Sequence, residues 1–308
     1  MSQRFIRTER ASCGMAEENV TSLDSTSIRR QYERVAPRYE TLAFLQREVG
    51  ERLITRLDYL KLAPQVIVDL GAGTGMAVPV LEKRFPKARL ILIDHSQAML
   101  QQAARRCRRW FSRTTRLCAD AAHTGLADAS VDMIHSNLLL HWLADLPATL
   151  AECRRILKPG GLLLFSTVGP ETLRELRRAW AAVDETPHVH VFLDMHDVGD
   201  AVIRAGFAAP VMERENLNVT YRAPEDLLRD LRGTGVRNAH PGRTRTLRGR
   251  SHRQAFLSAL ERGRREGLLS LSYEIVAGHA WAPTAGARPQ DGSTVAAFPV
   301  NQLKRRAP

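Results

Sequence analysis

Short apolar runs alternate with helical patterns from Gln65 to Thr167. The apolar runs are rich in β-branched residues and have the length of buried strands, whereas the segments between them carry apolar residues at helical spacing. The expected strands are 66–70, 89–93, 116–118, 131–136 and 161–167, and the expected helices are 76–84, 96–110 and 143–157. This alternation is typical of a parallel α/β sheet.

Two further helical patterns, 28–35 and 42–60, precede the first expected strand. Pro37 separates them, because proline lacks a donor N–H and its ring clashes with the preceding turn of a helix. We expect both helices to form an N-terminal cap beside the carboxyl edge of the sheet, where ligands bind in folds of this class.

A helical insertion at about 170–207 follows the fifth expected strand, and its position predicts a lid over the carboxyl edge of the sheet. Two more strands would complete a seven-stranded, mostly parallel sheet. The remaining expected elements are helices at 171–183, 194–205, 224–231 and 250–266, and strands at 211–221 and 269–279.

The composition sets the domain organisation. With 308 residues, 44% of them hydrophobic, the chain can bury a large core as one elaborated domain. We expect a disordered leader over 1–26, a folded domain over 27–282 and a disordered tail over 283–308. Neither a membrane-spanning run nor a signal-peptide pattern is found, so we expect a cytoplasmic protein. The four cysteines lack metal-site spacing, and no metal site is expected.

The segment Asp69-Leu-Gly-Ala-Gly-Thr-Gly75 is the strongest chemical signal, because it follows a strand pattern and opens a helical one. It differs from the dinucleotide motif G-x-G-x-x-G, since its third glycine comes one residue early and Met76 takes that place. Asp69 would repel a pyrophosphate but suits a cofactor that carries an ammonium and a sulfonium. The motif therefore predicts S-adenosylmethionine (SAM).

Polar groups that would hold this cofactor follow the strands. The glycines allow close backbone approach, and Asp94 at the end of the next strand would accept from the ribose hydroxyls, although it could instead cap a helix. Asp120 would accept from the adenine amino group, although it could be a solvated loop acid. The expected cofactor-binding residues are Asp69, Gly71, Ala72, Gly73, Gly75, Asp94, His95, Asp120, Ala121 and Asn137.

Methyl transfer to a carboxylate needs alignment and the exclusion of water more than acid–base catalysis. Aromatic walls for such a site would come from the cap and the insertion, where Tyr39, Phe44, His188, His190 and Phe192 lie. Of these, we expect Tyr39, His188 and Phe192 to contact the reacting groups. Each of them could instead be structural. His141, beside Trp142, could serve as a general base, but a pair of this kind is at least as often a packing element.

The net charge of +12 comes mainly from arginine and would attract a polyanion. Nucleic acid is not expected, because aromatic residues make up only 6% of the chain and no basic-aromatic stacking motif is found. An acidic protein is the alternative partner. The arginine clusters lie at 105–109, 174–178 and 243–253, and each could also be an ordinary solvated surface.

Several segments outside the glycine motif make the chain similar to the malonyl-acyl carrier protein O-methyltransferases of biotin synthesis. They are residues 28–40, 45–48, 136–142, 175–183, 188–192, 231–235 and 271–273, so the resemblance spans about 28–283. It implies a Rossmann-like class I methyltransferase fold, SAM as methyl donor, and acyl carrier protein as partner. It also places Tyr39 in a cap motif over the active site. His141 departs from the family, in which glutamine is frequent at this position.

The resemblance implies methylation of the free carboxyl of malonyl-acyl carrier protein. The resulting ester has lost the carboxylate's charge, so the unit could enter an apolar fatty-acid synthase site and be elongated towards pimeloyl, the biotin precursor. Two other functions stay open. One is a carboxyl methyltransferase for a small free acid of the aconitate type. The other is a SAM-fold protein that acts without catalysis, as an assembly factor or an RNA-binding module.

Overall fold

The computed structural model describes residues 23–107, 113–243, 246 and 249–284. Its centre is a seven-stranded sheet with the order β3-β2-β1-β4-β5-β7-β6, in which β7 alone runs antiparallel to its neighbours. The strands are β1 (Val66–Leu70), β2 (Arg89–Asp94), β3 (Thr114–Cys118), β4 (Val131–Ser136), β5 (Leu157–Val168), β6 (Ala208–Tyr221) and β7 (Leu269–Trp281). The expected seven-stranded, mostly parallel sheet is confirmed.

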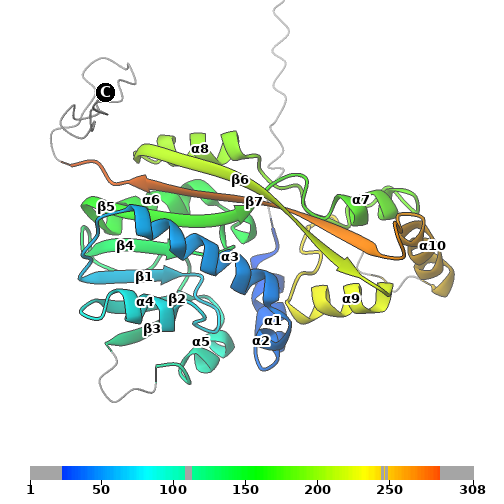
Figure 1. The fold of residues 1–308 in the computed structure, drawn as a ribbon, viewed down its shortest axis with the longest axis horizontal. Helices are drawn as coiled ribbons and strands as arrows, with labels where there is room; N and C mark the ends of the chain where they lie inside the picture. The colour runs from blue at the N-terminus through cyan, green and yellow to red at the C-terminus, as the bar shows by residue number, and fades with distance from the viewer. Residues whose placement is uncertain (1–22, 108–112, 244–245, 247–248, 285–308) are drawn as a thin grey trace, which may run out of the picture.

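Helices cover the sheet and extend beyond it (Figure 1). They are α1 (Ser25–Val35), α2 (Tyr39–Leu42), α3 (Phe44–Thr55), α4 (Val78–Arg84), α5 (Gln97–Ala103), α6 (Leu146–Ile156), α7 (Arg174–Ala181), α8 (Met195–Arg204), α9 (Pro224–Gly233) and α10 (Arg250–Glu261). The helix expected at 42–60 is interrupted at Ala43, which leaves the helical conformation, and its last turn is a 3₁₀ helix, Arg56–Tyr59.

The ends of the chain lie largely outside the described residues, and so do most of the expected leader and tail. Ordered structure begins before residue 27, because α1 starts at Ser25. Asp24 caps this helix by accepting a hydrogen bond from the Ser27 N–H at 2.9 Å. No helix of the described part is long and apolar enough to cross a membrane.

Two apolar layers enclose the parallel part of the sheet, and a third cluster forms a second lobe. One layer packs α6 and α8 on the sheet through residues such as Leu150 and Val202, and the other packs α3, α4 and α5 on the opposite face. The third cluster joins α7, α9 and α10 to the far ends of β6 and β7. Figure 1 shows these two long strands running past the end of β5 and carrying the three helices.

The insertion at 170–207 divides between these two parts. Helix α7 packs against α10 and β7 in the second lobe, whereas α8 packs against α6 and β6 as an ordinary helix of the sheet. Of the expected insertion, only the stretch before α8 borders the site described below, and its role as a lid stays a prediction.

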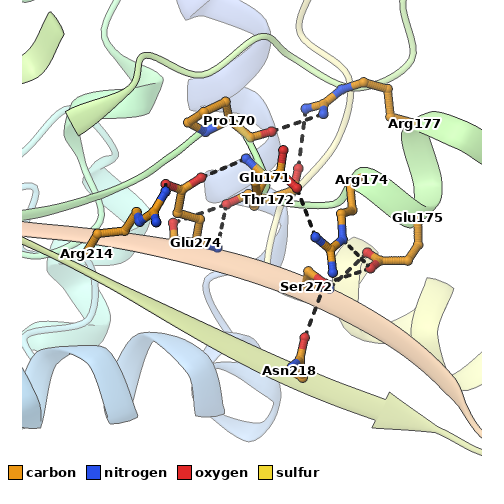
Figure 2. A network of polar contacts seen from close by, with 10 residues as sticks. All are labelled: Pro170, Glu171, Thr172, Arg174, Glu175, Arg177, Arg214, Asn218, Ser272 and Glu274. Atoms are coloured by element: carbon orange, nitrogen blue, oxygen red, sulfur yellow. Dashed lines mark hydrogen bonds and ion pairs between the residues drawn. The ribbon is translucent and has the colours of Figure 1, made fainter. Parts of the chain in front are cut away.

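A polar network fixes the start of the second lobe to β7 (Figure 2). The Glu274 side chain, only 2% exposed, accepts from the Glu171 N–H at 2.8 Å and forms an ion pair with Arg214 at 3.4 Å. The Ser272 N–H and hydroxyl both donate to Glu175, at 2.9 and 2.7 Å. A Cβ at Gly169 would lie 2.6 Å from Glu274 Cδ, so this position requires glycine. These bonds anchor α7 to the strand.

Replacement of Phe165 by alanine tests the packing of the sheet. Phe165 is fully buried on β5 and contacts β7 closely enough that a Cβ at Gly278 would lie 2.8 Å from its Cζ. We expect Phe165→Ala to lower the free energy of unfolding by about 3–5 kcal/mol in urea denaturation. The control Tyr59→Ala, at a residue 90% exposed, should change it by less than about 0.5 kcal/mol. Equal effects of the two substitutions would contradict this packing.

Candidate active site

A cavity of about 460 Å³ lies between the carboxyl edge of the sheet, the N-terminal helices and the second lobe. This volume is in the range of small-molecule sites. The edge of the sheet contributes the glycine turn together with Asp94, His95 and Asn137. The helices α1 to α3 contribute Tyr32, Tyr39 and Gln46, and the second lobe contributes Trp180, His190, Phe192, Leu231 and Phe256.

Asp94 organises the glycine turn. Its Oδ2 accepts from the Gly73 N–H at 2.9 Å, and its Oδ1 accepts from the Ser96 N–H at 2.8 Å. Gly71 and Gly73 have φ values of +74° and +55°, and nothing lies within 4 Å of a Cβ built on Gly73. Burial raises the pKa of Asp94, although the Ser96 and Gly73 N–H groups oppose the shift. The carboxylate thus shapes the turn and also faces the cavity.

A buried pair beneath the turn was not expected from the sequence. Asp69 and His135 are 3% and 1% exposed, and His135 Nδ1 lies 2.8 Å from Asp69 Oδ1. His135 Nε2 is buried and has no partner among the described residues. Asp69 lines the cavity, so it places a negative carboxylate beside the glycine turn, as its position in the motif predicts.

Aromatic rings form a second part of the cavity lining. Trp142 contacts the rings of Tyr32 and His190 edge to face, with centroids 6.0 and 5.6 Å apart, and His141 contacts Phe192 at 5.9 Å. Burial lowers the pKa of His141 to about 3 and that of His190 to about 4, and it raises the pKa of Tyr39. These side chains are therefore uncharged near neutral pH, and this side of the cavity is apolar.

His190 and His188 differ although they are two residues apart. The His188 ring stacks on Trp180 at 3.8 Å, and its Nε2 lies 3.0 Å from Asp184 Oδ1. His190 Nε2 accepts from the Ala239 N–H at 3.3 Å, so the neutral ring carries its proton on Nδ1, which is buried without a partner in the described part of the chain. The buried Nδ1 of His190 is therefore a hydrogen-bonding group that the described residues leave unused.

The expected site residues divide into two groups. The three expected to contact the reacting groups, Tyr39, His188 and Phe192, all line the cavity, as do the expected cofactor residues Asp69, Gly71, Ala72, Gly73, Asp94, His95 and Asn137. Three others, Gly75, Asp120 and Ala121, are not in the lining formed by the described residues. Asp120 is exposed, and its Oδ1 accepts from the Ala122 N–H at 2.8 Å. The functional roles of both groups stay predictions.

Asn137 shows how the N-terminal helices are joined to this edge. Its Nδ2 donates to the Gln46 carbonyl and its Oδ1 accepts from the Ser166 hydroxyl, both at 2.8 Å. A Cβ at Gly50 would lie 2.9 Å from that Nδ2, so α3 approaches the strand closely only with glycine there. Asn137 therefore holds the cap against the sheet in addition to lining the cavity.

Lining residues from α1, from the end of α9 and the loop after it, and from β7 were missed in the sequence. Tyr32, Arg232, Arg237 and Tyr273 belong to this group. Tyr32, Arg232 and Tyr273 lie in segments that carry the family resemblance, but a segment match alone assigns no place in space. Their positions depend on how the second lobe folds back over the glycine turn.

The chain is similar to known methyltransferases. A family model described as a methyltransferase domain matches residues 68–165. A malonyl-acyl carrier protein O-methyltransferase from Laribacter hongkongensis is 43% identical over 284 residues, which cover 89% of this chain and 96% of the relative. Another from Halorhodospira halophila is 41% identical over 92% of this chain and 97% of the relative.

Solved structures share the fold. The YcgJ protein from Bacillus subtilis superposes with a TM-score of 0.56 at 16% identity, over 76% of this chain and 98% of that one. A methyltransferase of Bacillus halodurans, described as putative, gives 0.55 at 15% identity, over 76% of this chain and all of that one. At these identities the likeness concerns the fold alone.

Substitution of Asp94 tests the expected cofactor site. In Asp94→Asn the charge is lost and an amide group must face the N–H of Gly73 or Ser96. We expect the dissociation constant for SAM, measured by calorimetry, to rise about tenfold or more. The control is Asp128→Asn, at an exposed carboxylate paired with Arg155, which should leave binding unchanged. Normal affinity in a folded Asp94→Asn protein would refute the assignment.

Proposed function

The chain belongs to the malonyl-acyl carrier protein O-methyltransferase family, and we propose that it transfers a methyl group from SAM to the free carboxyl of malonyl-acyl carrier protein. The observation that carries the proposal is the 43% identity to a relative of that name over 89% of this chain and 96% of the relative. A cavity that combines a charged glycine turn with an apolar aromatic wall supports it.

The residues at the glycine turn fit SAM, which is the methyl donor and supplies an electrophilic methyl group on a sulfonium. Each Asp94 oxygen accepts one backbone N–H and keeps a lone pair with which it could accept from a ribose hydroxyl. Asp69 is a buried carboxylate suited to the ammonium group, and the space over Gly73 is open. The backbone of the glycine turn, the two carboxylates and the open space over Gly73 therefore lie together at one site.

The aromatic wall would act by alignment and desolvation. A carboxylate is already a nucleophile near neutral pH, so the site needs no general base. The rings of Tyr39, Trp142 and Phe192 would exclude water from the acyl group, which strengthens its electrostatic interactions. His190 could donate from Nδ1 to an acyl oxygen without adding a charge. The methyl ester formed would be uncharged and suited to an apolar acyl-processing site, which agrees with a role in pimeloyl synthesis for biotin.

The two alternative functions fit less well. A small-acid methyltransferase would need no carrier protein, whereas the relatives described above are named for a carrier-bound substrate. A non-catalytic assembly factor or RNA-binding module would have no need for an intact glycine turn with Asp94 facing the cavity.

Mass spectrometry of the carrier protein tests the proposed function. Malonyl-acyl carrier protein is incubated with the protein and SAM, and free malonate and malonyl-coenzyme A serve as parallel substrates. We expect a methyl-sized mass gain on the carrier-bound malonyl group, much faster than on the small acid. Faster methylation of free malonate would instead favour the small-acid alternative, and no gain on any substrate with SAM binding intact would favour a non-catalytic role.

A further inference from the structure

Three arginines gather at the opening of the cavity. Arg34 lies in the last turn of α1, Arg232 in the last turn of α9, and Arg237 in the loop that follows. All three are exposed, and Arg232 and Arg237 also line the cavity. Side chains that are both exposed and part of the lining stand where the cavity meets solvent, so this edge of the opening is positively charged.

Backbone packing brings the three arginines together. Gly235, with a φ of +78°, turns the chain after α9, and a Cβ there would lie 3.3 Å from Tyr32 Cε1 and 3.5 Å from Val35 Cγ2. The Asp24 N–H donates to the Ala239 carbonyl at 3.0 Å, which joins the start of α1 to the same loop. The cluster is therefore held by packed backbone, not by chance side-chain positions.

The charges of this cluster are not neutralised within the described part of the chain, where none of the three arginines has an ion pair within 4.0 Å. Burial lowers the pKa of Arg237, and the neighbouring Arg34 and Arg232 lower it further. Other arginines of the protein do form ion pairs, since Arg174 pairs with Glu171 and Arg106 pairs with Glu40. Like charges held together at a cavity opening favour the binding of an anion.

The arginine clusters noted in the sequence, at 105–109, 174–178 and 243–253, do not form this group at the opening. Arg177 donates to the backbone carbonyls of Pro170, Thr172 and His190, which fixes the loop on the cavity wall. Arg109 lies outside the described residues. In the region 243–253, Arg243 pairs with Asp24 at 2.8 Å. Arg47 of α3 is also exposed and lines the cavity, and it donates to the Glu40 carbonyl at 3.1 Å. The arginines that α1, α9 and the loop after α9 contribute form a separate group at the opening.

We propose that Arg34, Arg232 and Arg237 bind the phosphate of the phosphopantetheine arm through which an acyl carrier protein presents its thioester. This proposal rests on the proposed function, because an acyl group in the cavity and a carrier outside it require the arm to cross the opening. The phosphodiester is the one charged group along that arm, and guanidinium groups bind phosphate oxygens in pairs of hydrogen bonds. Coenzyme A carries a phosphorylated arm as well, so the experiment must separate the two sources.

The test compares three malonyl thioesters: those of acyl carrier protein, of coenzyme A, and of pantetheine, which lacks the phosphate. In the double variant Arg232→Ala/Arg237→Ala, we expect kcat/KM on the two phosphorylated substrates to fall about tenfold or more relative to kcat/KM on malonyl-pantetheine, mainly through KM. The matched control is Arg229→Ala, which removes an exposed arginine of the same helix that pairs with Asp226. It should leave the ratio unchanged.

Two results would overturn the proposal. An equal loss on all three thioesters would show that the arginines do not recognise the phosphate, and a loss confined to the carrier protein would assign them to the carrier's protein surface instead. A wild-type protein inactive on every thioester would count against the proposed function alone. Calorimetry would then still test the arginines, with free phosphopantetheine and pantetheine as ligands of the wild-type protein and of the double variant. If the double variant binds only phosphopantetheine more weakly than the wild type does, the assignment is supported. If both proteins bind phosphopantetheine equally well, the assignment is overturned.

Discussion

The antiparallel pairing of β7 with its two neighbours is the interaction on which the site depends. The second half of β7, Ile275–Trp281, pairs with both β5 and β6, whereas its first half, from Leu269 to Glu274, pairs with β6 alone. The two long strands therefore leave the sheet together and carry α7, α9 and α10 beyond it (Figure 1). Glu274 lies where β5 ends, and its buried carboxylate holds the first turn of the next segment to the strand. Without this extension the cavity would lose the lining that the second lobe contributes, such as Leu231 and Phe256.

The cavity formed in this way has three electrostatic regions. At the edge of the sheet, Asp69 and Asp94 place negative charge beside the glycine turn, which suits a cationic cofactor. The aromatic part of the lining is uncharged, because burial keeps His141 and His190 neutral. The opening carries arginine charge from α1, α9 and the loop after it. A negatively charged acyl group would thus pass from a positively charged opening to an interior from which the aromatic rings exclude water. There its carboxylate would meet the sulfonium of SAM.

Much of the fold follows from local sequence, but most of the aromatic part of the cavity lining does not. The strands were predictable because runs of β-branched residues and the turn residues between them are local signals. The glycine turn was predictable because the backbone conformation that it requires is also local. His188 and His190 look equivalent in sequence, yet Asp184 and Trp180 engage the first while Ala239 orients the second. The division of the insertion between lobe and sheet likewise depends on tertiary packing, which periodicity does not encode.

The central claim is that this site transfers a methyl group by alignment and desolvation, without a titrating base. The most direct test is the pH dependence of kcat for methylation of malonyl-acyl carrier protein, from about pH 5.5 to about 9. A flat profile is predicted, because the pKa of His141 is about 3 and that of His190 about 4, while burial keeps the Tyr39 phenol protonated. The substrate carboxyl is ionised throughout this range. A tenfold fall per pH unit below a midpoint of about 6–7 would reveal a general base and contradict the account.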